Sequence, residues 1–389
     1  MTQKAYRYRC YPTLELNAFL AKTFGCCRFV YNTFLAKKQK HYEEHKKTLS
    51  YGECSRMLAE LKQTKEWLKE VSSVALQQSL RHLETAFERF FQKKGAFPKF
   101  KKRCYQQSAT FMKNAFTFKK GELWLAKCTQ PLNIRWSRRF YGEPSSITIT
   151  MDQRGRFYIS FLVEEVILPL PPAQKTVGID LGLTHSVTTS RGEKTEPGHF
   201  LKKQLKRLRR RQKALSRKIK GSINFHKARK AIGQLCGKVR DSRTDYLHKI
   251  STKLVNENQV ICIEDLAVKN MIKNKHLSRS IADAGWGILV RFLKYKSDWY
   301  GRQLVKIDRF FPSSQQCCDC KTLHKQLKLS DRVWRCVHCH KEHDRDVSAA
   351  KNIEEEGLRQ INWSTVGHTG FQACGANVRP TWATSGSLL

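Results

Sequence analysis

Three acidic residues stand at the ends of apolar segments that lie far apart in the sequence. Asp180 ends the run VGID, Glu264 ends the run VICIE, and Asp346 lies in HDRDVSAAKNI. Carboxylates at the ends of separate buried strands can hold two Mg²⁺ ions over a phosphodiester, one activating water and one stabilising the leaving oxygen. We therefore interpret the three acids as a candidate site for metal-dependent phosphodiester hydrolysis.

Each acid has a simpler interpretation when it is taken alone. An Asp at the end of a strand, such as Asp180, is more often a turn or cap residue. Glu264 also has Asp265 beside it, and Asp346 has Asp344 two residues earlier. Adjacent residues on a strand face opposite ways, so only one of each pair can point at a shared site. The hypothesis depends on the set, because three acids end three apolar elements in a basic chain.

A second candidate site consists of two Cys-x2-Cys pairs with 15 residues between them: Cys317, Cys320, Cys336 and Cys339. Two thiolate pairs at this spacing are typical of a tetrahedral Zn²⁺ site in a zinc ribbon. Four thiolates close the coordination shell, so the zinc is expected to be structural and not catalytic.

Two features near the cysteines complicate this assignment. Cys318 is a competing thiol in QQCCDC, and the glycine that usually follows each pair is replaced by Lys321 and His340. Histidines close to the second pair could also substitute as ligands: His338, His340 and His343.

The composition indicates a polyanionic partner. The 389 residues include 73 Lys and Arg against 33 Asp and Glu, a formal net charge of +40. Nucleic acid, bound through its phosphates, is the obvious partner. A membrane surface is the alternative, but the charge is spread along the whole chain and not clustered beside an anchor. The sequence contains no apolar stretch of 18 residues and no signal peptide, which predicts a soluble intracellular protein.

The length predicts two to four domains, and the first half changes character once. Apolar residues recur at helical spacing from about 14 to 91. Gly95 and Pro98 break this pattern, and short alternating runs from about 108 to 168 predict the strands of a small barrel or curled sheet. The first segment, YRYRCYP, also alternates. The helical block would then be an insertion between strands of one sheet.

The second half is expected to alternate strands with helices. Strands are predicted in VGIDLGL, HSVTTS, VICIEDL and LVKIDRF, and helices at about 242–257, at 281–303 and in DVSAAKNIEEE. Eleven Lys and Arg without an acid lie between Lys202 and Lys220. A solvated helix face is the simpler interpretation, but this density of one charge favours a helix that follows phosphates. Its candidate contacts are Lys203, Arg207, Arg210 and Arg211.

An ordered set of segments resembles the TnpB (OrfB) family of bacterial insertion sequences, compact RNA-guided DNA nucleases related to type V CRISPR effectors. The set is GIDLG, IEDL, FPSSQQCCDC, LSDRVWRCVHC and HDRDVSAAKNI, with YRCYPT, FGCCRFVYN and FPKFKK upstream. The resemblance covers nearly the whole chain. It implies an α/β multidomain protein, in which a RuvC nuclease domain with an RNase H-like fold is interrupted by a zinc ribbon. An N-terminal β-barrel with an inserted α-helical recognition domain would precede it.

The resemblance also implies roles for particular residues. Asp180, Glu264 and Asp346 fall on the RuvC acids, with Mg²⁺ or Mn²⁺ as the catalytic cofactor, and the four cysteines fall on the ligands of a structural Zn²⁺. Ser348 replaces an Asn that is usual in the family, and we expect it to modulate activity. The implied boundaries are 1–13 and 101–170 for the wedge-like β-barrel, 14–100 for the recognition domain, 174–311 and 344–360 for RuvC, 312–343 for the zinc ribbon, and 361–389 for a partly disordered tail.

The function implied by the resemblance is that of an RNA-guided DNA endonuclease of a transposable element. One chain would bind a guide RNA from its own locus in the bacterial cytoplasm, near the nucleoid, and base pairing would select the double-stranded target DNA. The protein itself would read a short flanking motif. Gln77 and Gln78 are candidates because amides suit adenine edges, although surface glutamines of a helix are an equally simple interpretation.

Two other functions stay open. A guide-directed repressor that binds without cutting would be favoured by the loss of a RuvC acid, and none is lost. A DNA-joining transposase that uses the same fold without RNA would need to bind the ends of its element, and the sequence contains no clear helix-turn-helix for that purpose.

Overall fold

The computed structural model describes residues 2–328 and 330–361, so the predicted tail lies almost entirely outside the described residues. Within the described residues, no helix combines the length and the apolar character needed to cross a membrane. The chain divides into two compact units: Met1–Ile167 with Arg211–Gly237, and Leu168–Arg210 with Lys238–Leu389.

The first unit is built on a five-stranded antiparallel sheet in the order β2-β6-β7-β1-β5. All nine residues of β1 pair with β7, from Thr2 opposite Glu165 to Cys10 opposite Phe157. The helical block is therefore inserted between strands of one sheet, as the alternation in YRYRCYP predicted. The strands are β1 (Thr2–Cys10), β2 (Gln107–Met112), β5 (Ile134–Arg135), β6 (Pro144–Met151) and β7 (Phe157–Glu165), with a separate hairpin of β3 (Phe116–Lys119) and β4 (Glu122–Leu125).

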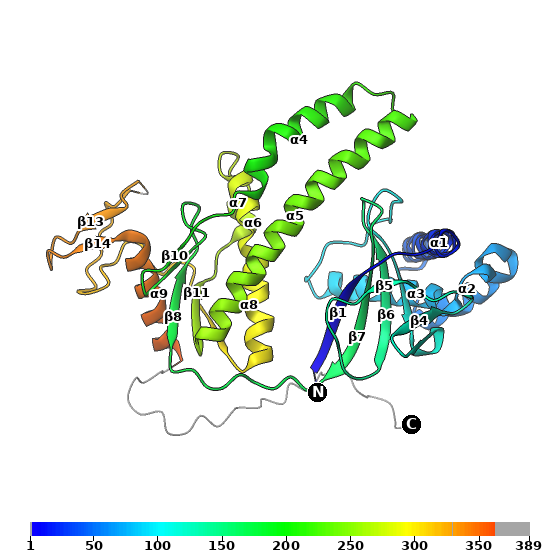
Figure 1. Ribbon diagram of the computed structural model, residues 1–389, viewed down its shortest axis with the longest axis horizontal. Helices are drawn as coiled ribbons and strands as arrows, with labels where there is room; N and C mark the ends of the chain where they lie inside the picture. The colour runs from blue at the N-terminus through cyan, green and yellow to red at the C-terminus, as the bar shows by residue number, and fades with distance from the viewer. Residues whose placement is uncertain (1, 329, 362–389) are drawn as a thin grey trace. The chain divides into compact units, whose positions relative to one another are not determined.

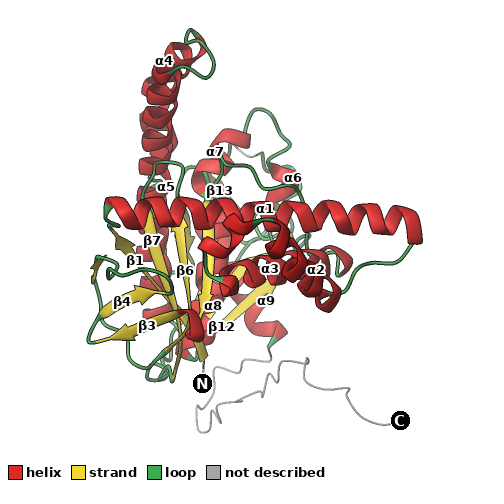
Figure 2. Cartoon of the chain, turned by 90° about the vertical axis from the view of Figure 1, so that its right-hand side faces the viewer, coloured by secondary structure: helices red, strands yellow, loops and turns green. Residues whose placement is uncertain are grey.

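Helices cover this sheet and share its apolar core. The Thr13 hydroxyl accepts a hydrogen bond from the backbone N–H of Leu16 and begins α1, which Figure 2 shows as one continuous helix. Ser50 and Glu53 form a capping box that begins α2. The helices are α1 (Leu14–His45), α2 (Tyr51–Thr64) and α3 (Ser73–Phe91), with 3₁₀ turns η1 (Glu66–Glu70) and η2 (Lys113–Ala115).

The second unit is built on a mixed sheet in the order β10-β9-β8-β11-β12. Strands β8, β11 and β12 are parallel, whereas β9 and β10 are antiparallel to their neighbours. The parallel strands have apolar residues on both faces, as expected for strands covered on both sides. Their bounds are β8 (Thr176–Asp180), β9 (Val187–Thr189), β10 (Lys194–Thr195), β11 (Val260–Glu264) and β12 (Gln303–Ile307).

Alternate residues of β11 enter two different cores. Ile261 and Ile263 pack with α5 and α8, whereas Val260 and Cys262 pack with Ile353 of α9. Figure 1 shows α9 and the pair α5 and α8 on opposite sides of β8 and β11, which makes a three-layer arrangement. The remaining helices of the described residues are α4 (Phe200–Ser216), α5 (Ile223–Glu257), α6 (Val268–Met271), α7 (Ser278–Ala284), α8 (Trp286–Tyr300) and α9 (Arg345–Gln360).

Two predicted helices differ from those observed. The helix predicted at 242–257 begins much earlier, at Ile223, and the glycines at 233 and 237 explain why its first half was missed. The helix predicted at 281–303 is broken at Gly285, whose φ of 73° ends α7 and begins α8, and residue 303 already belongs to β12.

Candidate active site and metal centre

Asp180 and Glu264 are the last residues of two neighbouring parallel strands, β8 and β11. Ile179 lies opposite Ile263 in their register, so the two acids leave the same edge of the sheet. Asp346 lies in the first turn of α9, which packs on this sheet. Three acids far apart in the sequence are therefore brought to one edge of one sheet.

Two glycines allow α9 to approach the sheet closely. A Cβ at Gly178 of β8 would lie 2.0 Å from the backbone oxygen of Ala350, and a Cβ at Gly357 would lie 2.4 Å from Sγ of Cys262. Neither space can accept a side chain unless the backbone moves. The position of Asp346 relative to the two strands thus depends on the absence of side chains at residues 178 and 357.

The acids influence each other electrostatically. Burial, and then the charges of Glu264 and Asp346, raise the pKa of Asp180 to about 7. Burial also raises the pKa of Glu264, and a hydrogen bond donated by Ser313 opposes that rise. Repulsion among half-buried carboxylates is the electrostatic setting in which a divalent cation is favoured.

The three acids are more widely spaced than a preformed ligand cluster. Among the described residues, two groups of metal-binding side chains have ligand atoms that all lie within 4.8 Å of one another. They are the four cysteines and the set Cys318, Asp319 and His343. The acids do not form such a group.

The neighbouring acids make other contacts. Asp265 is half-buried and pairs with Lys306 at 3.2 Å and Arg309 at 2.8 Å. Asp344 accepts a hydrogen bond from the backbone N–H of Val347 as the N-cap of α9, and it pairs with Lys194 at 2.6 Å. These ion pairs contribute to lowering the pKa of both carboxyls. The structure therefore separates each candidate acid from its rival.

Several residues that the sequence did not single out contact the acids. The Ser313 hydroxyl donates a hydrogen bond to Glu264. Arg332 donates to Asp346 at 3.0 Å and to the hydroxyl of Thr184 at 3.4 Å, and Nδ1 of His185 lies 3.6 Å from Asp346. No spacing rule connects these positions, so only the fold reveals them.

Ser348, which replaces the usual Asn, is buried in α9 and does not bond a carboxylate. Its hydroxyl lies 3.5 Å from the backbone oxygen of Gln316. Asn352, one turn later, donates to the backbone oxygens of Ser313 and Gln316 at 2.9 and 2.7 Å. This face of α9 therefore holds the segment that presents Ser313 to Glu264.

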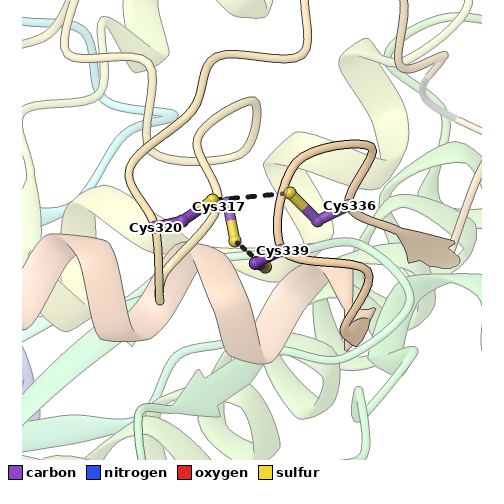
Figure 3. A group of neighbouring side chains, drawn as sticks. All are labelled: Cys317, Cys320, Cys336 and Cys339. Carbon is purple, nitrogen blue, oxygen red and sulfur yellow. Dashed lines mark hydrogen bonds between the residues drawn. The ribbon is translucent and has the colours of Figure 1, made fainter.

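The four cysteines approach one another from two loops, as Figure 3 shows. Sγ of Cys317 lies 3.7 Å from Sγ of Cys339, and Sγ of Cys320 lies 3.5 Å from Sγ of Cys336. Hydrogen bonds from Thr322 lower the pKa of the Cys320 thiol, which favours the thiolate that a metal requires. The second cysteine pair lies in the turn of a short hairpin of β13 (Val333–Arg335) and β14 (Glu342–Asp344), and Trp334 of β13 packs with Cys317 and Cys336.

The two cysteine loops repeat one backbone pattern. The N–H of Lys321 bonds the carbonyl of Cys317 at 3.0 Å, and the N–H of His340 bonds the carbonyl of Cys336 at the same distance. Lys321 and His340 both have left-handed backbones, with φ of 62° and 56°. These are the two positions where glycine was expected, so the turn is kept although the glycine is not.

The candidate nucleic-acid contacts lie on helices and differ in exposure. Gln77 is exposed and Gln78 is half-buried on α3. Arg211 of α4 donates a hydrogen bond to the backbone oxygen of Ala231 in α5, so it has a structural partner. The remaining three are exposed on α4: Lys203, Arg207 and Arg210.

Three parts of the chain match described protein families. Residues 160–275 match "Probable transposase" (OrfB_IS605), residues 286–353 match "Cas12f1-like, TNB domain", and residues 1–47 match "Helix-turn-helix domain". Among the described residues of the last match, β1 is followed by one uninterrupted helix of 32 residues, so they do not form a helix-turn-helix.

Two relatives resemble the chain over nearly its full length. A protein of Streptomyces pristinaespiralis named "Putative RNA-guided DNA endonuclease" is 45% identical over 384 residues, which cover 97% of this chain and 92% of that protein. InsQ of Escherichia coli K12, with the same description, is 34% identical over 373 residues, which cover 91% and 92%. The chain belongs to the TnpB (OrfB) family.

A solved structure shares the fold. The Cas12f1 chain in a complex with single guide RNA and target DNA matches with a TM-score of 0.55 at 13% identity, covering 91% of this chain and 98% of that chain. The α/β arrangement described above is therefore of the Cas12f1 type.

Proposed function

We propose that this protein is an RNA-guided DNA endonuclease of a transposable element, which cuts DNA beside a short flanking motif. The observation that carries the proposal is the meeting of Asp180, Glu264 and Asp346 at one sheet edge. The names of the two long relatives and the net charge of +40 support it. All three acids are present, so the chain has the groups for cleavage that a repressor would not need. The substrate would be DNA of the bacterial nucleoid.

The mixed sheet of the second unit, with α9 on one face, is proposed as a RuvC nuclease domain of RNase H-like fold. Residues 312–343 would be a zinc ribbon inserted in it. The antiparallel sheet of the first unit would be the N-terminal β-barrel, and α1 to α3 its inserted recognition domain. The sheet orders and the insertion of the helices between β1 and β2 support this division.

The acid site fits Mg²⁺ or Mn²⁺ because carboxylate oxygens are the ligands these hard cations prefer, and because burial and then the charges of its two neighbours destabilise Asp180 as an anion. Bound ions would activate water and stabilise the leaving oxygen. Ser313 would orient Glu264 through its hydrogen bond, and Arg332 would hold Asp346 in place while adding positive charge beside the phosphate. His185, with Nδ1 at 3.6 Å from Asp346, would also restrict this carboxylate.

The cysteine site fits a structural Zn²⁺, since four sulfurs from two equivalent turns already lie within a few ångströms of one another. Removal of this metal would unfold the ribbon locally, because its own core is little more than Trp334 and the cysteines. Arg332 lies between the two cysteine pairs, so the ribbon would also present this residue to Asp346.

The guide RNA would neutralise much of the excess positive charge before the target is met. Lys203, Arg207 and Arg210 would contact phosphates from the exposed side of α4. Base pairing would supply sequence specificity, and Gln77 with Gln78 would read the flanking motif. One chain per guide RNA is the proposed stoichiometry.

The proposal is tested with protein purified with the RNA of its own locus. A plasmid that bears the matching target and flanking motif should be cut in Mg²⁺, and RNase treatment of the protein or addition of a chelator should abolish cutting. Efficient site-specific cutting by RNA-free protein would contradict the proposal and favour the DNA-joining transposase.

A further inference from the structure

Two histidines outside the cysteine set lie against its sulfurs. Nε2 of His324 is 3.2 Å from Sγ of Cys336, and Nε2 of His343 is 3.1 Å from Sγ of Cys317. Both distances are in the range of a hydrogen bond to sulfur. Each bonded cysteine is the first of its pair, so the two contacts are equivalent.

The sequence repeats the arrangement. Each histidine is the fourth residue after the second cysteine of a pair, which gives the pattern Cys-x2-Cys-x3-His twice, ending at His324 and at His343. The contacts cross over, because each imidazole bonds the first cysteine of the opposite pair. Together with the matching turns at Lys321 and His340, this makes the module pseudo-symmetric in its backbone and in its hydrogen bonds.

Trp334 holds both rings. Its ring centroid is 4.7 Å from that of His324 and 5.0 Å from that of His343, which lies directly opposite it in the β13–β14 pair. Trp334 and His343 are buried, so neither ring can move freely. The imidazoles are therefore placed by packing, in contrast to His338, which is exposed.

The arrangement also gives Cys318 a role other than that of a competing ligand. Its sulfur lies 3.6 Å from Nδ1 of His343, on the opposite side of the ring from Cys317. A thiol at this position donates weakly to Nδ1, and that contact fixes the tautomer in which Nε2 carries the proton.

We propose that His324 and His343 are crossed outer hydrogen-bond donors to the zinc thiolates, one for each cysteine pair. The inference rests on the proposed zinc site. Four thiolates around Zn²⁺ leave a net charge of −2, and each N–H···S bond withdraws charge from a sulfur and ties one half of the module to the other. Partners of this kind typically change metal affinity by about 10- to 100-fold when they are removed. The imidazoles would be positioning residues and not ligands.

The test replaces Zn²⁺ by Co²⁺ in the full-length protein bound to its RNA and follows the thiolate-to-Co²⁺ charge-transfer absorption. In His343→Leu and His324→Leu the band should move to lower energy with its four-thiolate intensity unchanged, and Zn²⁺ should pass to a chelator about 10-fold faster or more. His343→Gln keeps a side-chain N–H and should restore both properties. His338→Leu is the matched control and should behave as wild type.

Three results would overturn the inference. Unchanged band position and release rate in both Leu variants would show that the contacts are incidental. A wild-type charge-transfer intensity that is one thiolate short of four, and that does not fall when one of the four cysteines is changed to Ser, would make a histidine a ligand in place of that cysteine. Absence of any thiolate band in wild type would instead overturn the zinc site itself, and the inference with it.

Discussion

The cysteine site and the acid site lie in the same unit but are built in opposite ways. The cysteines come from two short loops with the same backbone pattern, and each loop is closed by a backbone hydrogen bond between its own residues. The acids come from two strands and a helix, and they meet only because α9 packs tightly on the sheet. The cysteine site should therefore be disrupted mainly by substitutions of its own ligands and turn residues. The acid site should also be disrupted by substitutions of residues that do not contact it but that position α9 on the sheet.

The largest expected effect is on the acids themselves. Cleavage of a matched plasmid should fall by at least about 100-fold in each of Asp180→Ala, Glu264→Ala and Asp346→Ala, because each change removes a carboxylate that would hold a catalytic metal ion. Binding of RNA and target, measured by gel shift, should stay near wild type. Asp265→Asn is a matched control, since Asp265 pairs with exposed cations and not with the site.

Asp344→Asn is the second control and the sharper one. Asparagine is a good N-cap, so α9 should still begin normally and only the pair with Lys194 is lost. Activity should fall by less than about 5-fold, as expected for a partly exposed ion pair. An inactive Asp344→Asn beside an active Asp346→Asn would reverse the assignment of the two acids.

The next largest expected effect is on the cysteine site. Cys336→Ser should lose most of the zinc, measured by elemental analysis of the purified protein, and the ribbon should become sensitive to protease. Cleavage should also fall, because Arg332 would no longer be presented to Asp346. Cys318→Ser should keep stoichiometric zinc. Full zinc in Cys336→Ser would mean that another thiol or a histidine is the ligand.

A glycine that touches neither metal site tests how the acid site is assembled. Gly178→Ala should push α9 away from β8, destabilise the protein by about 1–3 kcal/mol and reduce cleavage, with RNA binding retained. Gly287→Ala in α8 is the control, because a Cβ there meets nothing within 4 Å and should be neutral or slightly stabilising. Thermal unfolding and plasmid cleavage measure the two effects. Equal behaviour of the two variants would show that close packing is unimportant.

The smallest expected effect is a gain in the stability of a cysteine turn. His340→Gly relieves a left-handed backbone, which costs roughly 1 kcal/mol for a residue with a side chain. Part of this gain in stability is offset because glycine also raises the conformational entropy of the unfolded chain. Zinc release to a chelator should slow by a few-fold. Val337→Gly, on the exposed neighbouring turn with an ordinary backbone, should instead speed release.

The same contrast explains what the sequence could predict. The cysteine spacing was recognisable as a local pattern, and so were the acids at the ends of apolar segments. The structure brings both sets together, with Asp180 and Glu264 at strand ends and Asp346 in the first turn of a helix. The resemblance alone favoured Asp346 over Asp344, whereas the ion pair that occupies Asp344 depends on a tertiary contact with Lys194.

Other features lay beyond local patterns. Arg332 and His185 reach Asp346 from distant loops, and the tight contact at Gly178 depends on how α9 packs. The start of α5 was missed because two glycines weakened its periodicity. The two histidines behind the cysteines did have a signal, the repeated Cys-x2-Cys-x3-His, which is recognisable once the pairs are aligned.

Retargeting tests the central claim most directly. The protein is combined with either of two guide RNAs that differ only in the variable end, and each complex is offered two plasmids that differ only in the matching target beside the same flanking motif. The account predicts that the cut follows the guide in both cases. It also predicts that Asp180→Asn binds the matched plasmid without cutting it. A cut position that stays the same when the guide is changed, or a cut that persists in Asp180→Asn, would contradict the account.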